Sequence, residues 1–344
     1  MTQSGLPEGP EDDPQGPVLV AGGAGYIGSH TVRELVSRGI EVVILDDLST
    51  GHRESVPEGV PLVEASIGDR AAVREALAQY RPKAVIHFAA KCYVGVSVTD
   101  PATYYEENVI HTWSLLEELR AAEVKTIVFS STCATYGDPV TVPMTEDHQQ
   151  VPINPYGHTK LHIEHMLGDY GRAYGLRAAA LRYFNAAGAA TDGSVGEDHD
   201  PETHLIPLVL QVAQGRRESI SIFGEDYPTR DGSCIRDYIH VEDLADAHLR
   251  ALALLQSSEA GHQLRCNLGT GSGYSVKEVI EAARTITGHP IPAVVAPRRE
   301  GDPPELVSGG TRAKDVLGWA PRKAGLERIL EDAWRFHQGH PRGY

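Results

Sequence analysis

A glycine-rich turn between a strand and a helix constrains the fold of this chain more than any other stretch. The apolar run 18–21 predicts a buried strand, and the pattern over 26–38 predicts a helix. Glycines stand at even spacing where the two meet, at Gly22, Gly25 and Gly28. Glycine permits a tight turn and close approach of the backbone to a ligand, and a helix N-terminus offers free N–H groups and a positive dipole end. The turn is therefore suited to hold a phosphate group.

An acidic residue in the expected place strengthens this interpretation. In the dinucleotide-binding fingerprint, an acid about 20 residues after the glycines bonds the ribose hydroxyls. Asp46 stands at the end of a second predicted strand, 41–45, and Asp47 follows it. Because the run 46–50 contains no arginine that could hold a 2′-phosphate, the pattern favours NAD over NADP. A plain glycine turn would explain the glycines but not the second strand and the acid.

Strand and helix patterns alternate regularly through the first half of the chain. This alternation predicts an α/β fold, a Rossmann-type doubly wound parallel sheet with helices on both faces. In such sheets the ligand binds beyond the carboxyl ends of the strands, so the residues after each strand are the functional candidates. Further strands are predicted at 61–65, 83–88, 125–130 and 176–182, and further helices at 71–80, 103–121 and 155–174.

The pattern changes after Asn185, where a loop rich in Gly, Asp and Thr begins. The remaining elements predict a smaller mixed α/β lobe that binds the substrate. We expect a leader at 1–16, an NAD-binding domain at 17–185 with returning segments at about 233–270, and a substrate lobe mainly at 186–344. Later helices are predicted at 204–215, 241–255, 275–287 and 326–337, and short strands at 219–223 and 266–268.

The composition limits the possible partners. The 344 residues carry a formal net charge of −16, which argues against nucleic acid because phosphate backbones need a basic face. No apolar run approaches the length of a membrane span, and the segment 1–16 lacks the apolar core of a signal peptide. We expect a disordered leader and a cytoplasmic protein with no membrane partner.

Cysteine and histidine spacing gives no sign of a metal site. In a chain without a secretion signal, unpaired cysteines are expected to be reduced thiols. His162 and His165 could share a helix face, but packed or solvated histidines are the simpler interpretation. No metal is therefore expected. The four cysteines are Cys92, Cys133, Cys234 and Cys266.

The strongest catalytic signal is a tyrosine four residues before a lysine on a predicted helix. This spacing places Tyr156 and Lys160 on one helix face. A tyrosine is a poor base at neutral pH, since its reference pKa is about 10. A nearby ammonium and the positive nicotinamide of an oxidised cofactor both favour the phenolate. Such a phenolate could accept a proton from a hydroxyl while the carbon gives a hydride to NAD⁺. The alternative is an ordinary solvated pair.

A small hydroxyl after a strand is expected to complete this set. Ser130 and Thr132 follow the apolar part of this strand, 125–129, and Thr132 is the better candidate because it lies furthest past the strand end. The alternative for Thr132 is a cap of a helix or turn. Cys133 is expected to pack, since nothing near it in the sequence marks it as an activated nucleophile.

From about residue 18 to 344, the chain resembles the extended short-chain dehydrogenase/reductase family, and within it the UDP-sugar 4-epimerases. The motifs shared with the wider family lie at 22–30, 85–90, 129–132, 156–160 and 181–185. Those more specific to the epimerases lie at 222–232, 235–240, 296–302 and 341–344.

The resemblance implies an isomerase that interconverts UDP-galactose and UDP-glucose with tightly held NAD. Tyr156 would deprotonate the 4-hydroxyl while C4 passes hydride to NAD⁺. The 4-keto sugar would then turn over, and the hydride would return to its opposite face. The resemblance also implies a homodimer that pairs through helices such as 103–121 and the one beginning at Pro155.

Matching positions imply the binding residues as well. Arg236 and Arg299 match diphosphate-binding positions, which suits the paired hydrogen bonds that guanidinium groups make to phosphate. Asp302 matches a uridine ribose contact, Asn185 a diphosphate contact, and Phe184 a position near the nicotinamide. The expected catalytic residues are Tyr156, Lys160 and Thr132. The expected cofactor-binding residues are Gly22, Gly25, Tyr26, Ile27, Gly28, Asp46, Asp47, Ser66, Ile67, Phe88, Ala89, Ala90, Lys91, Asn108, Ser130, Tyr156, Lys160 and Phe184. The expected substrate-binding residues are Thr132, Tyr156, Asn185, His204, Leu205, Arg236, Arg299 and Asp302.

Four positions depart from the family pattern. Ser66 replaces an acid that usually bonds the adenine, and Lys91 stands one position earlier than the usual lysine. His204 stands where an asparagine is common beside the uridine pocket. Leu306 falls near a position whose bulk gates N-acetylated sugars, and leucine is neither large and aromatic nor small.

Other functions of the same fold remain as alternatives. A 4-epimerase of another UDP-sugar, either UDP-GlcNAc/UDP-GalNAc or UDP-xylose/UDP-arabinose, would use the same residues. A 4,6-dehydratase needs an acid pair right after the active-site threonine, where this chain has Cys133 and Ala134. A non-catalytic NAD-binding protein would have no need of Tyr156, Lys160 and Thr132 together.

Overall fold

The computed structural model describes residues 13–299 and 301–344, and a seven-stranded parallel sheet forms its centre. The strand order is β10-β6-β5-β4-β1-β2-β3, and every neighbouring pair is parallel. This confirms the predicted α/β class and Rossmann-type sheet. The strands are β1 (Val18–Ala21), β2 (Val42–Asp46), β3 (Leu62–Glu64), β4 (Ala84–His87), β5 (Thr126–Thr132), β6 (Arg177–Tyr183) and β10 (Gln263–Leu268).

Helices cover both faces of this sheet, because successive side chains of its central strands are apolar on both sides. Val18 and Val20 pack into one core with α1 and α8. Leu19 and Ala21 pack into a second core with α2, α5 and α6. The helices are α1 (Tyr26–Ser37), α2 (Arg70–Tyr80), α5 (His111–Ala121), α6 (Pro155–Tyr174) and α8 (Val241–Ser257).

The single helix predicted over 103–121 is interrupted. The chain forms α3 (Val94–Thr99), α4 (Pro101–Tyr104) and a π-helical segment (Tyr105–Ile110) before α5. Within that segment Asn108 is fully buried, and its side chain bonds both backbone groups of Lys91. Hydrophobic periodicity cannot register such a local widening of the helix, which is often found at functional sites.

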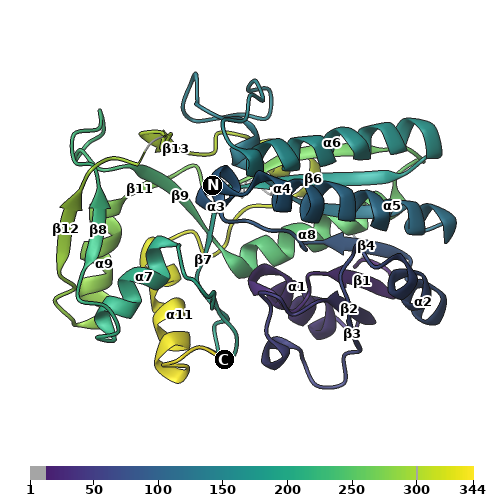
Figure 1. Cartoon of the computed structure of the whole chain (residues 1–344), viewed down its shortest axis with the longest axis horizontal. Coiled ribbons are helices and arrows are strands. Elements are labelled where there is room, and N and C mark those ends of the chain that lie inside the picture. The colour runs from purple at the N-terminus through teal and green to yellow at the C-terminus, as the bar shows by residue number, and fades with distance from the viewer. Residues whose placement is uncertain (1–12, 300) are drawn as a thin grey trace, which may run out of the picture.

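The second half of the chain builds a smaller lobe, on the left of Figure 1. Its sheet has the order β11-β9-β13, with β7 also paired to β9, and a separate pair joins β12 to β8. Helices α7, α9 and α11 share one apolar core with these strands. The strands are β7 (Asn185–Ala187), β8 (Ile220–Phe223), β9 (Ile235–His240), β11 (Gly273–Ser275), β12 (Ala293–Ala296) and β13 (Glu305–Leu306), and the helices are α7 (Leu205–Ala213), α9 (Val276–Thr287) and α11 (Leu326–Gly339).

The chain passes between the two lobes more than once. The strand expected to return to the large sheet does so as β10, beside β6, and α10 (Arg312–Leu317) packs into the core under α1 and α8. β9 pairs instead within the smaller sheet.

Residues 1–12 of the predicted leader lie outside the described residues, while Asp13 and Gln15 bond Arg38 and Gln256. Among the helices that the structure describes, none is both long enough and apolar enough to cross a membrane.

Candidate active site

A cavity of about 1010 Å³ lies at the carboxyl ends of the large sheet and is closed on its other side by the smaller lobe. The segments that follow β1, β2, β4, β5 and β6 line it, as the strand topology requires. Every residue expected to bind cofactor or substrate, or to act in catalysis, lines this one cavity except Asn108.

The glycine-rich turn presents bare backbone to the cavity. Gly22 has a φ of 79°, and a Cβ there would lie 2.5 Å from the backbone nitrogen of Ala89. A Cβ on Gly28 would lie 2.0 Å from the carbonyl oxygen of Gly22, so the helix could not start so close to the turn. Gly25 forms the N-cap of α1 and has no side chain to shield the N–H groups behind it. This turn fits the pyrophosphate of a dinucleotide.

Asp46 holds the loop beside this turn as well as facing the cavity. Its two carboxylate oxygens accept hydrogen bonds from the backbone N–H groups of Ala24 and Leu48, each at 2.9 Å. Burial raises the pKa of Asp46, and these two bonds act in the opposite direction. Each oxygen keeps a second lone pair, so the carboxylate can still accept a bond from a ribose hydroxyl.

Lys91 and Ser66, two departures from the family pattern, both lie at the cofactor end of the cavity. The Lys91 ammonium donates to the hydroxyl of Ser49 at 3.2 Å, which brings it beside the loop that follows Asp46. The Ser66 hydroxyl accepts a bond from the Gly68 backbone at 3.1 Å. Ser66 therefore replaces an acid with a weaker, partly occupied acceptor.

Asn108 lies behind the cavity wall. Its amide group bonds the backbone N–H and carbonyl of Lys91 at 2.8 and 3.0 Å and the hydroxyl of Thr159 at 3.1 Å. Asn108 fixes the backbone from which Lys91 projects, and the π-helical segment brings it there, while direct cofactor contact stays a prediction.

Tyr156 and Lys160 project from the first turns of α6. The helix begins where the Asn154 side chain accepts a bond from the Gly157 backbone at 2.8 Å. The Lys160 ammonium lies 5.8 Å from the centre of the Tyr156 ring and donates to the carbonyl oxygen of Ser130 at 2.9 Å. Burial lowers the pKa of Lys160 to about 8, so the group remains mostly cationic at neutral pH.

The Tyr156 phenol is protonated in the protein alone. Burial raises its pKa well above 10, and a hydrogen bond with Thr132 offsets only part of that rise. Positive charge close to the phenol, from the Lys160 ammonium or from an oxidised nicotinamide, would favour the phenolate.

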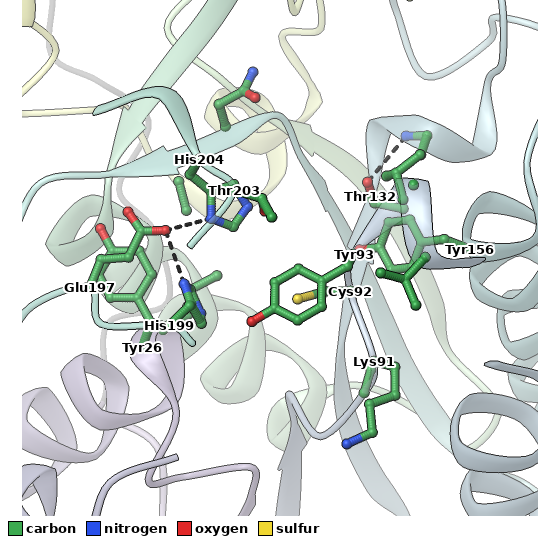
Figure 2. Close-up of a pocket in the computed structure, with 18 of the residues that line it drawn as sticks. Tyr26, Lys91, Cys92, Tyr93, Thr132, Tyr156, Glu197, His199, Thr203 and His204 are labelled. Carbon is green, nitrogen blue, oxygen red and sulfur yellow. Dashed lines mark hydrogen bonds and ion pairs between the residues drawn. The ribbon is translucent and has the colours of Figure 1, made fainter. Parts of the chain in front are cut away.

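The capping role that the sequence left open for Thr132 is observed, and its catalytic role stays a prediction. Its hydroxyl accepts a bond from the Ala134 backbone at 3.1 Å and so caps a short turn, Cys133–Thr135, and it also lines the cavity beside Tyr156 (Figure 2). Burial raises the pKa of Cys133 to about 12, which supports the expected packing role. All four cysteines are free thiols.

The opposite end of the cavity carries the expected substrate residues. Arg236, on β9, forms an ion pair with Asp302, and the Arg299 guanidinium lies 3.9 Å from the centre of the Phe223 ring. The Asn185 amide donates to the Asp237 carbonyl at 3.1 Å. His204 is the N-cap of α7, and Leu205 is its first residue.

Three residues on the cavity wall were missed by sequence reasoning. The Tyr93 ring lies between His199 and Tyr156 in Figure 2, 6.1 Å from the His199 ring, and its buried hydroxyl has no hydrogen-bond partner among the described residues. Glu197 and His199 lie beside His204. The available signal in the sequence is two histidines and two glutamates within the eight residues 197–204.

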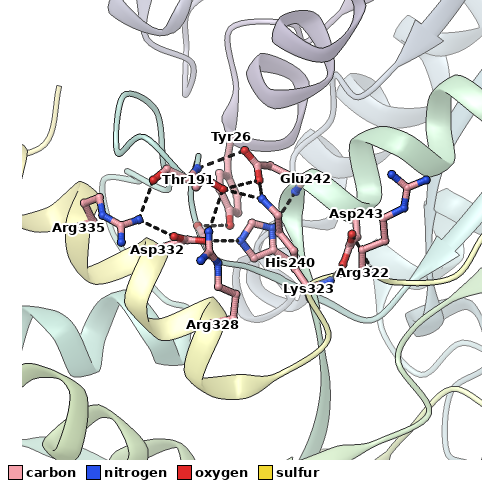
Figure 3. A network of polar contacts seen from close by, with 11 residues as sticks. Tyr26, Thr191, His240, Glu242, Asp243, Arg322, Lys323, Arg328, Asp332 and Arg335 are labelled. Atoms are coloured by element: carbon pink, nitrogen blue, oxygen red, sulfur yellow. Dashed lines mark hydrogen bonds and ion pairs between the residues drawn. The ribbon is translucent and has the colours of Figure 1, made fainter.

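A polar network fastens α11 to β9 and α8 beside the cavity (Figure 3). Asp332 is fully buried and receives contacts from Arg328 at 2.7 Å, Arg335 at 2.6 Å and the His240 ring at 3.2 Å. Burial alone would raise the pKa of Asp332, but these contacts outweigh it and lower the pKa. A buried carboxylate so fully paired fixes the position of the C-terminal helix.

Fold and site together define a dinucleotide-dependent enzyme of the short-chain dehydrogenase type, with two arginines, Arg236 and Arg299, lining the far end of the cavity. The chain belongs to the NAD dependent epimerase/dehydratase family, whose model matches residues 18–269. It is 52% identical over 327 residues to the UDP-glucose 4-epimerase of Halalkalibacterium halodurans, covering 95% of this chain and 97% of that protein.

Solved structures agree with this assignment. The UDP-glucose 4-epimerase of Brucella ovis in complex with NAD superposes with a TM-score of 0.90 at 49% identity, covering 93% of this chain and 98% of that one. The UDP-glucose 4-epimerase of Bifidobacterium longum in complex with NAD⁺ and UDP superposes with a TM-score of 0.89 at 35% identity, covering 95% and 99% of the two chains. The expected family resemblance is confirmed.

Proposed function

We propose that this protein interconverts UDP-galactose and UDP-glucose by inverting the configuration at C4, with NAD as its resident cofactor. The observation that carries the proposal is the shared cavity. Tyr156, Lys160 and Thr132 line the same space as the glycine turn, and Arg236 and Arg299 line its other end. The similarity to UDP-glucose 4-epimerases over nearly the whole chain supports it.

The residues at the large sheet fit NAD. The side-chain-free turn at Gly22 and Gly28 would receive the pyrophosphate, Asp46 the ribose hydroxyls, and Phe184 the nicotinamide end. When bound, NAD supplies an acceptor and donor of hydride for the sugar C4. The remaining members of the proposed cofactor set are Gly25, Tyr26, Ile27, Asp47, Ser66, Ile67, Phe88, Ala89, Ala90, Lys91 and Ser130.

The chain's own residues manage the proton at the sugar O4. Tyr156, once ionised, accepts the O4 proton and later returns it. Lys160 is held by the Ser130 carbonyl and contributes a fixed positive charge behind the tyrosine. Thr132 can donate a hydrogen bond to the same oxygen, because the bond from Ala134 uses its hydroxyl only as an acceptor.

The nucleotide end is anchored by charge, which leaves the hexose free to turn. Arg236 keeps unpaired N–H groups beyond its ion pair with Asp302 and can bind the diphosphate together with Arg299. Asp302 is the proposed acceptor for the uridine ribose, and Asn185 adds an amide at the diphosphate. His204 and Leu205 complete the proposed set at the start of α7.

The decisive experiment is to incubate the purified protein with UDP-galactose, without added NAD, and to analyse the sugar nucleotide. We expect UDP-glucose to form at a rate that scales with the NAD that co-purifies. If no UDP-glucose forms although NAD is bound, the proposed function is wrong. Parallel incubations with UDP-GalNAc and UDP-arabinose test the alternative substrates. Leu306, near the position whose bulk gates N-acetylated sugars, lines the cavity and packs against the cluster that contains Phe184.

A homodimer is part of this proposal. Helices α3 and α5 and the intervening π-helical segment expose several large apolar side chains, which a second copy of the chain would cover. Light scattering at micromolar concentration should give twice the chain mass of 37.2 kDa. A cytoplasmic location agrees with four free thiols. The exposed apolar side chains outside the cavity are Tyr105, Ile110 and Trp113, whereas the exposed Val94, Val96 and Val98 of α3 also line the cavity.

A further inference from the structure

Four side chains that can bind a metal converge at the substrate end of the cavity. Glu197, His199, Glu202 and His204 come from one eight-residue stretch between β7 and α7, and one ligand atom of each lies within 4.8 Å of all the others. In Figure 2, Glu197, His199 and His204 point toward one another from the side of the cavity opposite Tyr156. None of the proposed catalytic steps uses this convergence.

The spacing of these atoms is close to that of ligands around one ion. The His204 Nδ1 lies 2.7 Å from Glu197 Oε1 and 3.3 Å from Glu202 Oε1. The His199 Nδ1 lies 3.4 Å from Glu197 Oε1 and 3.5 Å from Glu202 Oε2. With metal–ligand distances of about 2.0–2.1 Å, a tetrahedral zinc ion places its ligand atoms about 3.3 Å apart. Small shifts of the side chains would therefore admit an ion.

The Nδ1 atom of His199 provides a second, independent observation. The side chain is only 12% exposed, and within the described part of the chain this buried nitrogen has no hydrogen-bond partner, although carboxylate oxygens of Glu197 and Glu202 lie 3.4 and 3.5 Å away. Buried polar atoms of this kind are usually satisfied, and an unsatisfied one costs about 1–3 kcal/mol. A metal ion between the imidazole and the carboxylates would satisfy it.

The charges of the two glutamates also point to a cation at this position. The carboxylates of Glu197 and Glu202 are only 6% and 4% exposed, so their two negative charges require two positive ones nearby. Two protonated imidazoles or one divalent cation with two neutral imidazoles would each supply them. In the first arrangement the His199 Nδ1–H faces the two carboxylates at 3.4 and 3.5 Å, and in the second its lone pair binds the ion.

We propose that Glu197, His199, Glu202 and His204 bind one divalent transition-metal ion, with zinc as the best match. Two imidazole nitrogens and two carboxylate oxygens suit zinc, whereas magnesium and calcium prefer oxygen ligands throughout. Four protein ligands close a tetrahedral ion and leave no open position, which is typical of a structural site.

The ion would order the stretch that begins α7 and set the proton on His204. Ligation through Nδ1 leaves the hydrogen of this imidazole on Nε2. His204 lines the cavity and is about half exposed, so Nε2 can donate to a bound substrate. The site would thus fix the tautomer of the residue that stands where relatives often carry an asparagine amide.

Metal analysis of the tag-free holoenzyme tests the proposal. After equilibration with micromolar zinc and removal of free metal by gel filtration, we expect one zinc per chain. The His199→Gln/Glu202→Gln double variant should lose this zinc. His162→Gln, which changes an exposed histidine on α6, should retain it. Equal zinc contents near zero in all three proteins would overturn the proposal, as would retention by the double variant.

If the double variant does not fold, a titration of the unmodified protein with Co²⁺ tests whether the four side chains bind a metal ion. Saturation at one equivalent with the strong visible bands of four-coordinate cobalt, reversed by added zinc, is the expected result. Absence of saturable binding would show that the four side chains form only a proton-charged cluster. Neither measurement depends on epimerase activity, so a failure of the proposed function and a failure of this site are distinguishable.

Discussion

The ammonium of Lys160 donates to the carbonyl oxygen of Ser130 at 2.9 Å, which ties the start of α6 to the carboxyl end of β5. This bond holds the lysine charge 5.8 Å from the centre of the Tyr156 ring, at the wall of the cavity. The ammonium also lies 4.8 Å from the centre of the Phe129 ring, whose negative face favours a cation. The position of the Lys160 charge in the candidate catalytic site therefore depends on the position of β5.

Replacing Tyr156 by phenylalanine removes the proposed base without changing the shape of the cavity wall. We expect Tyr156→Phe to lower turnover by about 10²- to 10⁴-fold, since general base catalysis is worth about this much. Its NAD content and UDP affinity should stay within a few-fold of the unchanged protein. Tyr174→Phe, at the exposed end of the same helix, is the matched control. Near-normal turnover of Tyr156→Phe would remove this residue as the base.

Lys160→Met tests whether a fixed charge promotes ionisation of the tyrosine. Without the cation, the pKa of Tyr156 in the NAD-bound enzyme should rise, so turnover at neutral pH should fall at least about tenfold. The pH at which activity reaches half its maximum should move upward. A pH–rate profile measures this, with Lys83→Met, at an exposed lysine, as the control. An unchanged profile would show that Lys160 does not act through Tyr156.

The large sheet and its helices were predictable because each element has an apolar pattern that can be recognised from its own residues. β1, β2 and β4 are continuous apolar runs, and the predicted helix 155–174 has the same bounds as α6. β9 was missed as a strand because Arg236, Asp237 and His240 interrupt its apolar pattern. Their side chains are accommodated by an ion pair, loop N–H groups and the Asp332 carboxylate, which only the tertiary structure brings together.

The site was predictable where strand ends define it and not where loops fold back. Thr132 is the last residue of β5 and Tyr156 lies in the first turn of α6, and both line the cavity at the carboxyl edge of the sheet. Asn108 reaches the wall from behind because a π-helical segment turns it inward. The approach of Glu197 to His204 depends on the path of an irregular loop, for which hydrophobic periodicity gives no signal.

Arg236→Ala and Arg299→Ala test whether one end of the cavity binds UDP and the other end binds NAD. Each variant should weaken UDP binding by about 10- to 100-fold, because a hydrogen bond to a charged group is worth about 1.5–3 kcal/mol. NAD content should not change, since both arginines lie at the substrate end. Calorimetric titration with UDP measures the effect, and Arg172→Ala, an exposed arginine on α6 outside the cavity, is the control. Loss of NAD from either variant would contradict the assignment.

Three buried histidines make the fold sensitive to mild acid. Burial is the main cause that lowers the pKa of His30 to about 4, of His87 to about 3 and of His248 to about 4. In each ring one nitrogen has a partner, while the other is buried without one and cannot donate a second proton favourably.

The sign follows from these pKa values. The unfolded chain binds the three protons near pH 6.5, whereas the native chain does so only near pH 3–4. The stabilisation is complete above pH 6.5 and falls by about 1.4 kcal/mol per pH unit for each histidine as the pH drops below that value. Denaturant unfolding at constant protein and NAD concentration, at pH 7.5 and 5.5, measures this loss. His248→Gln should reduce the slope by about one proton, whereas the exposed-site variant His162→Gln should leave it unchanged; equal slopes in the two variants would show that His248 titrates alike in both states.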